Sequence, residues 1–185
     1  MRVDASPTAT YAFRPGIFRF ARISAMTKTD RLLEIIQQIA DQFQVFRSRG
    51  PGEGNRVTNQ AIAAMNDLAA SELGPNVTQR VLGSNANQSV DFYLEEEAAV
   101  IEVEFSLSNP YPCLEKDAFK VLLAKDRGCA IETLVLVGDP GCKKRLSAPA
   151  PRAILEWIKR RHDISVRVVE LIDRSSSAKG EVATA

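Results

Sequence analysis

Residues 90–105 have the sequence VDFYLEEEAAVIEVEF, in which two apolar runs flank a short acidic turn. This pattern is typical of a β-hairpin. If the four residues before Ala99 form the loop, Leu94 lies opposite Ala99 and Phe92 lies opposite Ile101. The register puts only apolar pairs on one face of the hairpin and therefore predicts which side is buried.

The other face of this hairpin carries carboxylates. In the same register Asp91 lies opposite Glu102, and Glu104, two residues further along its strand, points the same way. Opposed carboxylates repel each other, at a cost of roughly 0.2 to 1 kcal/mol where they are exposed and more where water is scarce. A divalent cation would offset this repulsion, and Mg²⁺ is usually held by one or two carboxylates. The three acids are therefore expected to converge on a shared ion.

Two simpler explanations of these acids remain open. Acidic residues on a two-stranded ribbon are often a solvated face, although Glu102 and Glu104 interrupt a run apolar enough to be an interior strand of a covered sheet. A charge in such a strand needs a partner, and Lys116 and Lys120 of the next predicted helix are candidates for structural salt bridges. The glutamates at 95–97 are expected only to form an exposed turn.

Composition limits the class of protein. The chain has 185 residues, 45% of them hydrophobic and 25% charged, which suits one globular domain with a substantial core. No run approaches a membrane span, and 24 basic against 23 acidic side chains indicate no general affinity for polyanions. Cys113, Cys129, Cys142 and the single His162 lack the spacing of a zinc site. Reduced thiols in a cytoplasmic protein without a membrane partner are expected.

The pattern of elements predicts an α/β fold. Residues 1–26 are expected to be a disordered extension and residues 173–185 a disordered tail, leaving one domain over 27–172. Apolar periodicity and turn residues predict alternating helices and strands in that domain. The helices are expected at about 29–46, 58–73, 114–126 and 151–161, and the strands at 77–82, in the hairpin, at 131–137 and at 164–171.

This order of elements, together with the three acids, resembles the PD-(D/E)xK nuclease superfamily over about residues 58–171. Asp91 matches the first acid of its motif, Glu102 the second, and Glu104 stands where the lysine usually is, as in a minority of the family. The resemblance implies a restriction-endonuclease-like αβββαβ core. Its mixed central sheet would be flanked by helices, with an added N-terminal helix and a C-terminal αβ unit.

The resemblance also implies an activity and roles for residues. It implies a metal-dependent endonuclease that hydrolyses DNA, in which Asp91 and Glu102 hold Mg²⁺, or Mn²⁺, and Glu104 activates water. Glu72, on the helix before the sheet, is expected as a further metal ligand. Lys120 is expected to replace the missing lysine of the motif. The plain alternative for Glu72 is a helix-end residue in solvent, and for Lys120 it is simple exposure.

A basic run could contact the substrate. Lys143, Lys144 and Arg145, in a predicted loop after the 131–137 strand, are expected with Arg152 to clamp phosphates, although short basic runs are often only soluble loops. A homodimer is possible, as for many duplex cutters of that family. Two other functions stay open. One is a non-catalytic interaction or regulatory module, whose acids would be paired with lysines, and the other is a metal-dependent hydrolase acting on RNA or a nucleotide.

Overall fold

The computed structural model describes residues 26–47, 52–78, 89–106 and 109–174. The extension expected at 1–26, apart from Met26, and the tail expected at 173–185, apart from its first two residues, lie outside the described residues. Among the helices of the described part, none combines the length and the apolar character needed to cross a bilayer.

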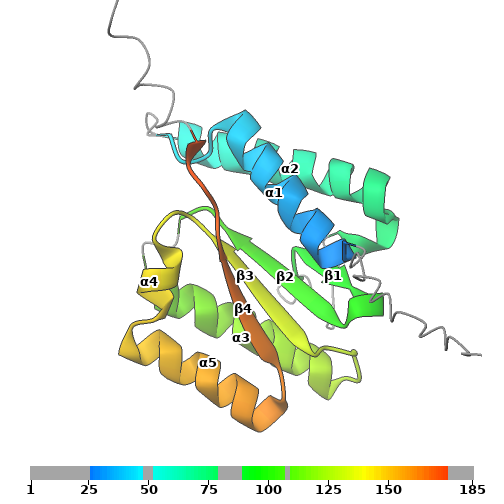
Figure 1. Ribbon diagram of the computed structural model, residues 1–185, viewed down its shortest axis with the longest axis vertical. Coiled ribbons are helices and arrows are strands. Elements are labelled where there is room, and N and C mark those ends of the chain that lie inside the picture. Colours follow the sequence, from blue (N-terminus) through cyan, green and yellow to red (C-terminus); the bar gives the residue numbers. More distant parts are fainter. Residues whose placement is uncertain (1–25, 48–51, 79–88, 107–108, 175–185) are drawn as a thin grey trace, which may run out of the picture.

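The fold is α/β, with one mixed sheet of four strands in the order β1-β2-β3-β4. Strand β1 is antiparallel to β2, whereas β2, β3 and β4 run parallel to one another. Helices cover both faces of the sheet (Figure 1). The elements are α1 (Lys28–Phe43), α2 (Glu53–Leu73), η1 (Pro75–Val77), β1 (Phe92–Leu94), η3 (Glu95–Glu97), β2 (Ala99–Glu104), α3 (Pro110–Asp126), β3 (Thr133–Gly138), α4 (Cys142–Leu146), α5 (Pro149–His162) and β4 (Ser165–Glu170).

The hairpin predicted from residues 90–105 is confirmed, with its register. Phe92 pairs with Ile101 and Leu94 pairs with Ala99, so the loop consists of η3 and Ala98. Strand β2 then pairs with β3 along all six of its residues. It is therefore an interior strand, and its first five residues are buried.

Two apolar cores lie on the two faces of the sheet. Because side chains alternate along a strand, Ile101 and Val103 of β2 pack toward α1 and α2, while Val100 packs toward α3 and α5. Figure 1 shows the same layers, with α1 and α2 above the sheet and α3 and α5 below it. Each large side chain buried in this way contributes about 1.5 to 3 kcal/mol. Glu102 lies on the same face as Val100, so it is buried in the layer of α3.

The acidic turn is more than an exposed loop, which corrects the expectation for residue 97. Helix α1 begins after Thr27, whose side chain accepts a hydrogen bond from the N–H of Asp30. The Glu97 carboxylate accepts hydrogen bonds from the N–H of Lys28 at 2.6 Å, the N–H of Thr29 at 3.0 Å and the Thr29 hydroxyl at 2.6 Å. These bonds satisfy donors that the first turn of a helix leaves free, and they lower the pKa of Glu97 despite its partial burial. The turn therefore fastens α1 to the hairpin.

The largest differences from the predicted helices are the starts of α2 and α3 and one additional helix. Helix α2 begins at Glu53, five residues before the predicted start, and follows Gly52, which has a positive φ of 78°. Helix α3 begins at Pro110, since a proline in the first turn lacks only an N–H that would have no helical acceptor. The loop predicted to contain the basic run is instead the short helix α4.

The strand predicted at 77–82 is described only at its start. Val77 ends the short helix η1, and Thr78 forms an isolated antiparallel bridge with Phe92. Residues 79–88 lie outside the described part of the chain. The bridge places Thr78 beside β1, at the edge opposite β2.

Candidate functional site

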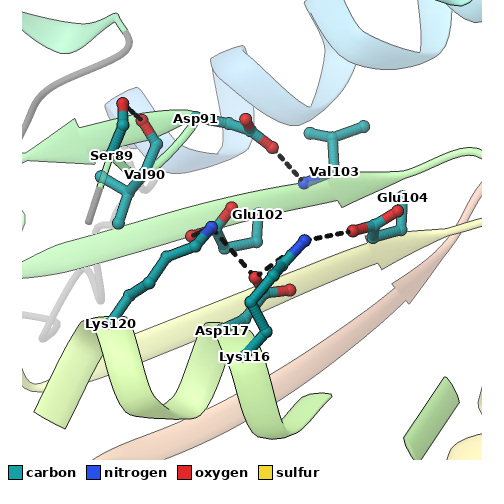
Figure 2. A network of polar contacts seen from close by, with 9 residues as sticks. All are labelled: Ser89, Val90, Asp91, Glu102, Val103, Glu104, Lys116, Asp117 and Lys120. Carbon is teal, nitrogen blue, oxygen red and sulfur yellow. Dashed lines mark hydrogen bonds and ion pairs between the residues drawn. The ribbon is translucent and has the colours of Figure 1, made fainter. Parts of the chain in front are cut away.

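Three elements bring the candidate residues together. Glu102 and Glu104 lie two residues apart on β2, so both point to the side of the sheet covered by α3. Lys116 and Lys120, one turn apart on α3, reach up to them, and Figure 2 shows both ammonium groups beside the carboxylates of β2. Asp91 is the residue immediately before β1.

The inner part of the site is a buried ion triad. Lys120 Nζ lies 2.9 Å from Glu102 Oε1 and 3.0 Å from Asp117 Oδ1. The three side chains are almost closed to water, with exposed fractions of 11% for Lys120, 4% for Glu102 and 2% for Asp117. A buried ion pair of this kind gains little net stability, because desolvation offsets the attraction, but removing one partner leaves a costly unpaired charge.

The outer part of the site faces the solvent. Lys116 Nζ lies 3.1 Å from Glu104 Oε1 and 3.7 Å from Asp117 Oδ1. More than half of the Lys116 side chain is exposed, and so is about a third of the Glu104 side chain. Lys116 and Glu104 therefore stand between the buried triad and water.

Asp91 does not point to the lysines. Its Oδ2 accepts a hydrogen bond of 2.8 Å from the backbone N–H of Val103, as Figure 2 shows. The carboxylate replaces the backbone acceptor that a longer β1 would offer to the N–H of Val103, because β1 begins only at Phe92. Burial raises the pKa of Asp91, and the bond from Val103 and the charge of Lys120 oppose that rise. The residue thus belongs to the electrostatic environment of the triad without an ion pair to it.

The electrostatics of the cluster favour uptake of positive charge. Burial, together with the negative charges of Asp117 and Asp91, raises the pKa of Glu102 from its ordinary value of 4.5 to about 8. Burial raises the pKa of Asp117 as well. Burial alone would lower the pKa of Lys120, but Glu102 and Asp117 outweigh it and hold that pKa above its usual value. Strongly perturbed acids gathered in this way are typical of functional sites.

The charges in the cluster do not balance. With every group ionised, the four carboxylates of Asp91, Glu102, Glu104 and Asp117 exceed the two ammonium groups of Lys116 and Lys120 by two formal negative charges. In the part of the chain that the structure describes, no three His, Cys, Asp or Glu side chains are arranged to hold a metal ion. The three acids do not converge on one point, because Asp91 accepts a hydrogen bond from Val103, whereas Glu102 and Glu104 pair with Lys120 and Lys116. The donors nevertheless suit Mg²⁺ in type, being carboxylate oxygens, and in charge.

Asp117 is the member of the site that sequence reasoning missed. It lies at the spacing of the buried stripe of α3, three residues after Leu114 and four before Val121, where an acid is costly unless it is paired. That position, with lysines one residue before it and three after it, is the signal that could have identified it.

Glu72 is not brought to this site, which corrects the expectation of a further metal ligand. It lies at the end of α2, in the helical layer on the other face of the sheet (Figure 1). Both of its carboxylate oxygens accept hydrogen bonds from Arg31, at 2.6 and 2.9 Å. Glu72 therefore ties α2 to α1, and the plain alternative of a helix-end surface residue is the better description.

The four residues of the predicted phosphate clamp lie on two different helices, α4 and α5. Lys143 and Lys144 are exposed on α4, which follows the end of β3. Arg145 on the same helix forms an ion pair with Asp139. Arg152 lies on α5, paired with Glu156 at 2.9 Å. The two lysines thus present their charges to solvent, whereas both arginines have acidic partners.

Helix α4 also borders the carboxylate cluster. A small space of about 10 Å³ is lined by Glu102, Glu104 and Asp117 from the cluster and by Leu146 of α4. Its volume is on the order of that needed for one water molecule. The space beside these three acids therefore has room for about one water molecule and for no larger group.

Comparison with models of protein families, with curated proteins and with solved structures finds no match to this chain. Its function must therefore be argued from the site itself.

Proposed function

We propose that this chain is a metal-dependent endonuclease of the restriction-endonuclease-like fold, acting on DNA phosphodiester bonds. The observation that carries the proposal is the cluster of Glu102, Glu104 and Asp117 on β2 and α3, which together with the nearby Asp91 exceeds Lys116 and Lys120 by two formal charges. An excess of buried carboxylates is unfavourable unless a cation compensates it. A single Mg²⁺ or Mn²⁺ ion would cancel the surplus.

The residues have distinct roles in this proposal. Asp91 and Glu102 would hold the ion, which would supply Lewis-acid stabilisation of the phosphate and a more acidic bound water. Glu104, at the solvent side of the cluster, would orient the attacking water and accept its proton. Lys120 would place its ammonium against the negative charge that builds up on the phosphate, in place of the lysine missing from the motif.

The position of α4 supports a polyanionic substrate. In open sheets with parallel strands, ligands bind beyond the carboxyl ends of the strands. Glu104 ends β2 there, opposite Gly138 at the end of β3, and α4 with Lys143 and Lys144 follows directly. The proposed clamp consists of these two exposed lysines, with Arg145 and Arg152 joining it only if they leave their acidic partners.

A second candidate function is favoured by a specific observation. Glu102 and Glu104 each form an ion pair with a lysine of α3, and the space between them is small. A non-catalytic interaction or regulatory module, which needs no ion, would have this arrangement. The two candidates differ in whether divalent cations change the behaviour of the protein.

One experiment separates them. The purified chain is incubated with Mg²⁺ or Mn²⁺ and with duplex DNA, single-stranded DNA and RNA, beside Asp91→Ala, Glu102→Ala and the control Glu72→Ala. Metal-dependent cleavage that is lost in the first two variants and kept in the control supports the nuclease. Cleavage without metal, or none with any substrate, removes it, and preference for RNA would change the substrate class.

A further inference from the structure

The ion pairs of Glu102 and Glu104 with the lysines of α3 do not explain why an acid occupies position 117. Its side chain is 2% exposed, and it lies between two ammonium groups, 3.0 Å from Lys120 and 3.7 Å from Lys116. If Lys116 and Lys120 served only to neutralise Glu102 and Glu104, a third carboxylate would add a desolvation cost without supplying a partner that either lysine lacks. An apolar residue would suit the buried stripe of α3 better.

Lys120 is held from two directions. Glu102 on β2 and Asp117 on its own helix contact the same ammonium group at nearly equal distances, 2.9 and 3.0 Å. A cation bound to Glu102 would repel Lys120 and compete with it for the same oxygens. Asp117 would then be the remaining anionic partner of Lys120, and the two groups already lie 3.0 Å apart.

We propose that Asp117 is a positioning residue that keeps the Lys120 ammonium in the site when a divalent cation occupies Asp91 and Glu102. This inference rests on the proposed function and deepens it. With Asp117 present, the four carboxylates balance the two lysines and one divalent ion. Without Asp117 the same set carries a net positive charge, so the ion and Lys120 exclude each other.

The test is the affinity for Mn²⁺ alone, measured by calorimetry on the full chain without substrate. Asp117→Asn keeps the shape of the side chain and is expected to weaken binding about tenfold, since Lys120 then stays on Glu102. The matched control is Glu115→Gln, which removes one exposed acid from the same helix and is expected to change the affinity by about twofold or less. Circular dichroism establishes that each variant is folded.

A double-mutant cycle with Lys120→Met identifies the route of the effect. In that background there is no lysine to hold, so Asp117→Asn is expected to weaken Mn²⁺ binding by only about twofold. An equal loss of Mn²⁺ affinity with and without Lys120 would show that Asp117 acts on the ion directly. This result would overturn the inference about Asp117 and leave the proposed metal site standing. Absence of Mn²⁺ binding by the wild type would overturn the proposed metal site and the inference together.

Lys120→Met by itself keeps the inference testable if Asp117→Asn does not fold. It removes the competitor of the ion and leaves every carboxylate in place. It is therefore expected to bind Mn²⁺ at least as tightly as the wild type. Weaker binding by this variant would overturn the inference, because Lys120 would then not oppose the ion at Glu102.

Discussion

Replacing Lys120 with methionine should destabilise the fold far more than the same change at Lys116. Methionine keeps much of the apolar stem of a lysine and removes its charge. At position 120 the change leaves Glu102 and Asp117, which are 4% and 2% exposed, without their shared partner. Removing one member of a buried ion pair typically costs about 3 to 5 kcal/mol. At position 116 the closest pair lost is with Glu104 at the surface, which is worth about 0 to 1 kcal/mol, and Asp117, 3.7 Å from Lys116, keeps its nearer contact with Lys120.

Urea unfolding at neutral pH without divalent cations measures this difference. With a slope of about 2 kcal/mol per molar urea, Lys120→Met should lower the midpoint by roughly 2 M and Lys116→Met by at most about 0.5 M. Unchanged slopes would show that the two variants unfold between comparable states. Equal shifts for the two variants, or a cost below about 1 kcal/mol for Lys120→Met, would refute the claim that the triad is buried and coupled.

Three further predictions concern other parts of the structure. Glu97→Gln should cost about 1 to 2 kcal/mol in urea unfolding because it weakens the cap of α1, whereas Glu96→Gln, at the exposed Lys28 pair, should cost less than about 0.5 kcal/mol; equal costs would contradict the cap. Because the folded state raises the pKa of Glu102 from 4.5 to about 8, it binds a proton that the unfolded chain releases, so stability without metal should fall as the pH rises from about 4.5 to about 8. Thermal melts should show this fall in the wild type and lose it in Glu102→Gln; an identical slope in both would exclude Glu102 as the cause. Lys143→Ala with Lys144→Ala should reduce the slope of log affinity for DNA against log salt by about 2, and an unchanged slope would exclude α4 from phosphate contact.

The hairpin could be predicted in detail because its information is local. The alternation of apolar residues in 90–105 and the length of its turn are sufficient to fix the pairs Phe92 with Ile101 and Leu94 with Ala99. The interior position of β2 was predicted from the apolar character of the run that Glu102 and Glu104 interrupt. The α/β class was predicted as well, from the order of elements, and the mixed sheet was implied by the resemblance.

Features that depend on distant contacts were not predictable in this way. The role of Glu97 depends on α1, which precedes it by almost 70 residues. The separation of Glu72 from the other acids depends on which face of the sheet α2 covers. The direction of Asp91 depends on where β1 begins, since only an unpaired N–H at Val103 gives its carboxylate a backbone partner. In each case the residue type was noticed, and its partner came from another element.

The helix boundaries differ for chemical reasons. A helix accepts proline in its first turn, so α3 begins at Pro110, four residues before the predicted start at 114. The basic run lies in a helix and not in the predicted loop, because the five-residue helix α4 is too short to show periodicity in the sequence. Asp117 was overlooked because only the apolar members of the α3 stripe were considered.

Diffraction from crystals of the full chain soaked in Mn²⁺ tests the central claim most directly, because the anomalous signal of manganese locates the ion without reference to activity. The account predicts one ion bound by oxygens of Asp91 and Glu102 at about 2.0 to 2.2 Å, with Lys120 moved from Glu102 toward Asp117. Crystals that take up no manganese at these residues, with Lys120 still paired to Glu102, would contradict it and leave the non-catalytic module as the better description.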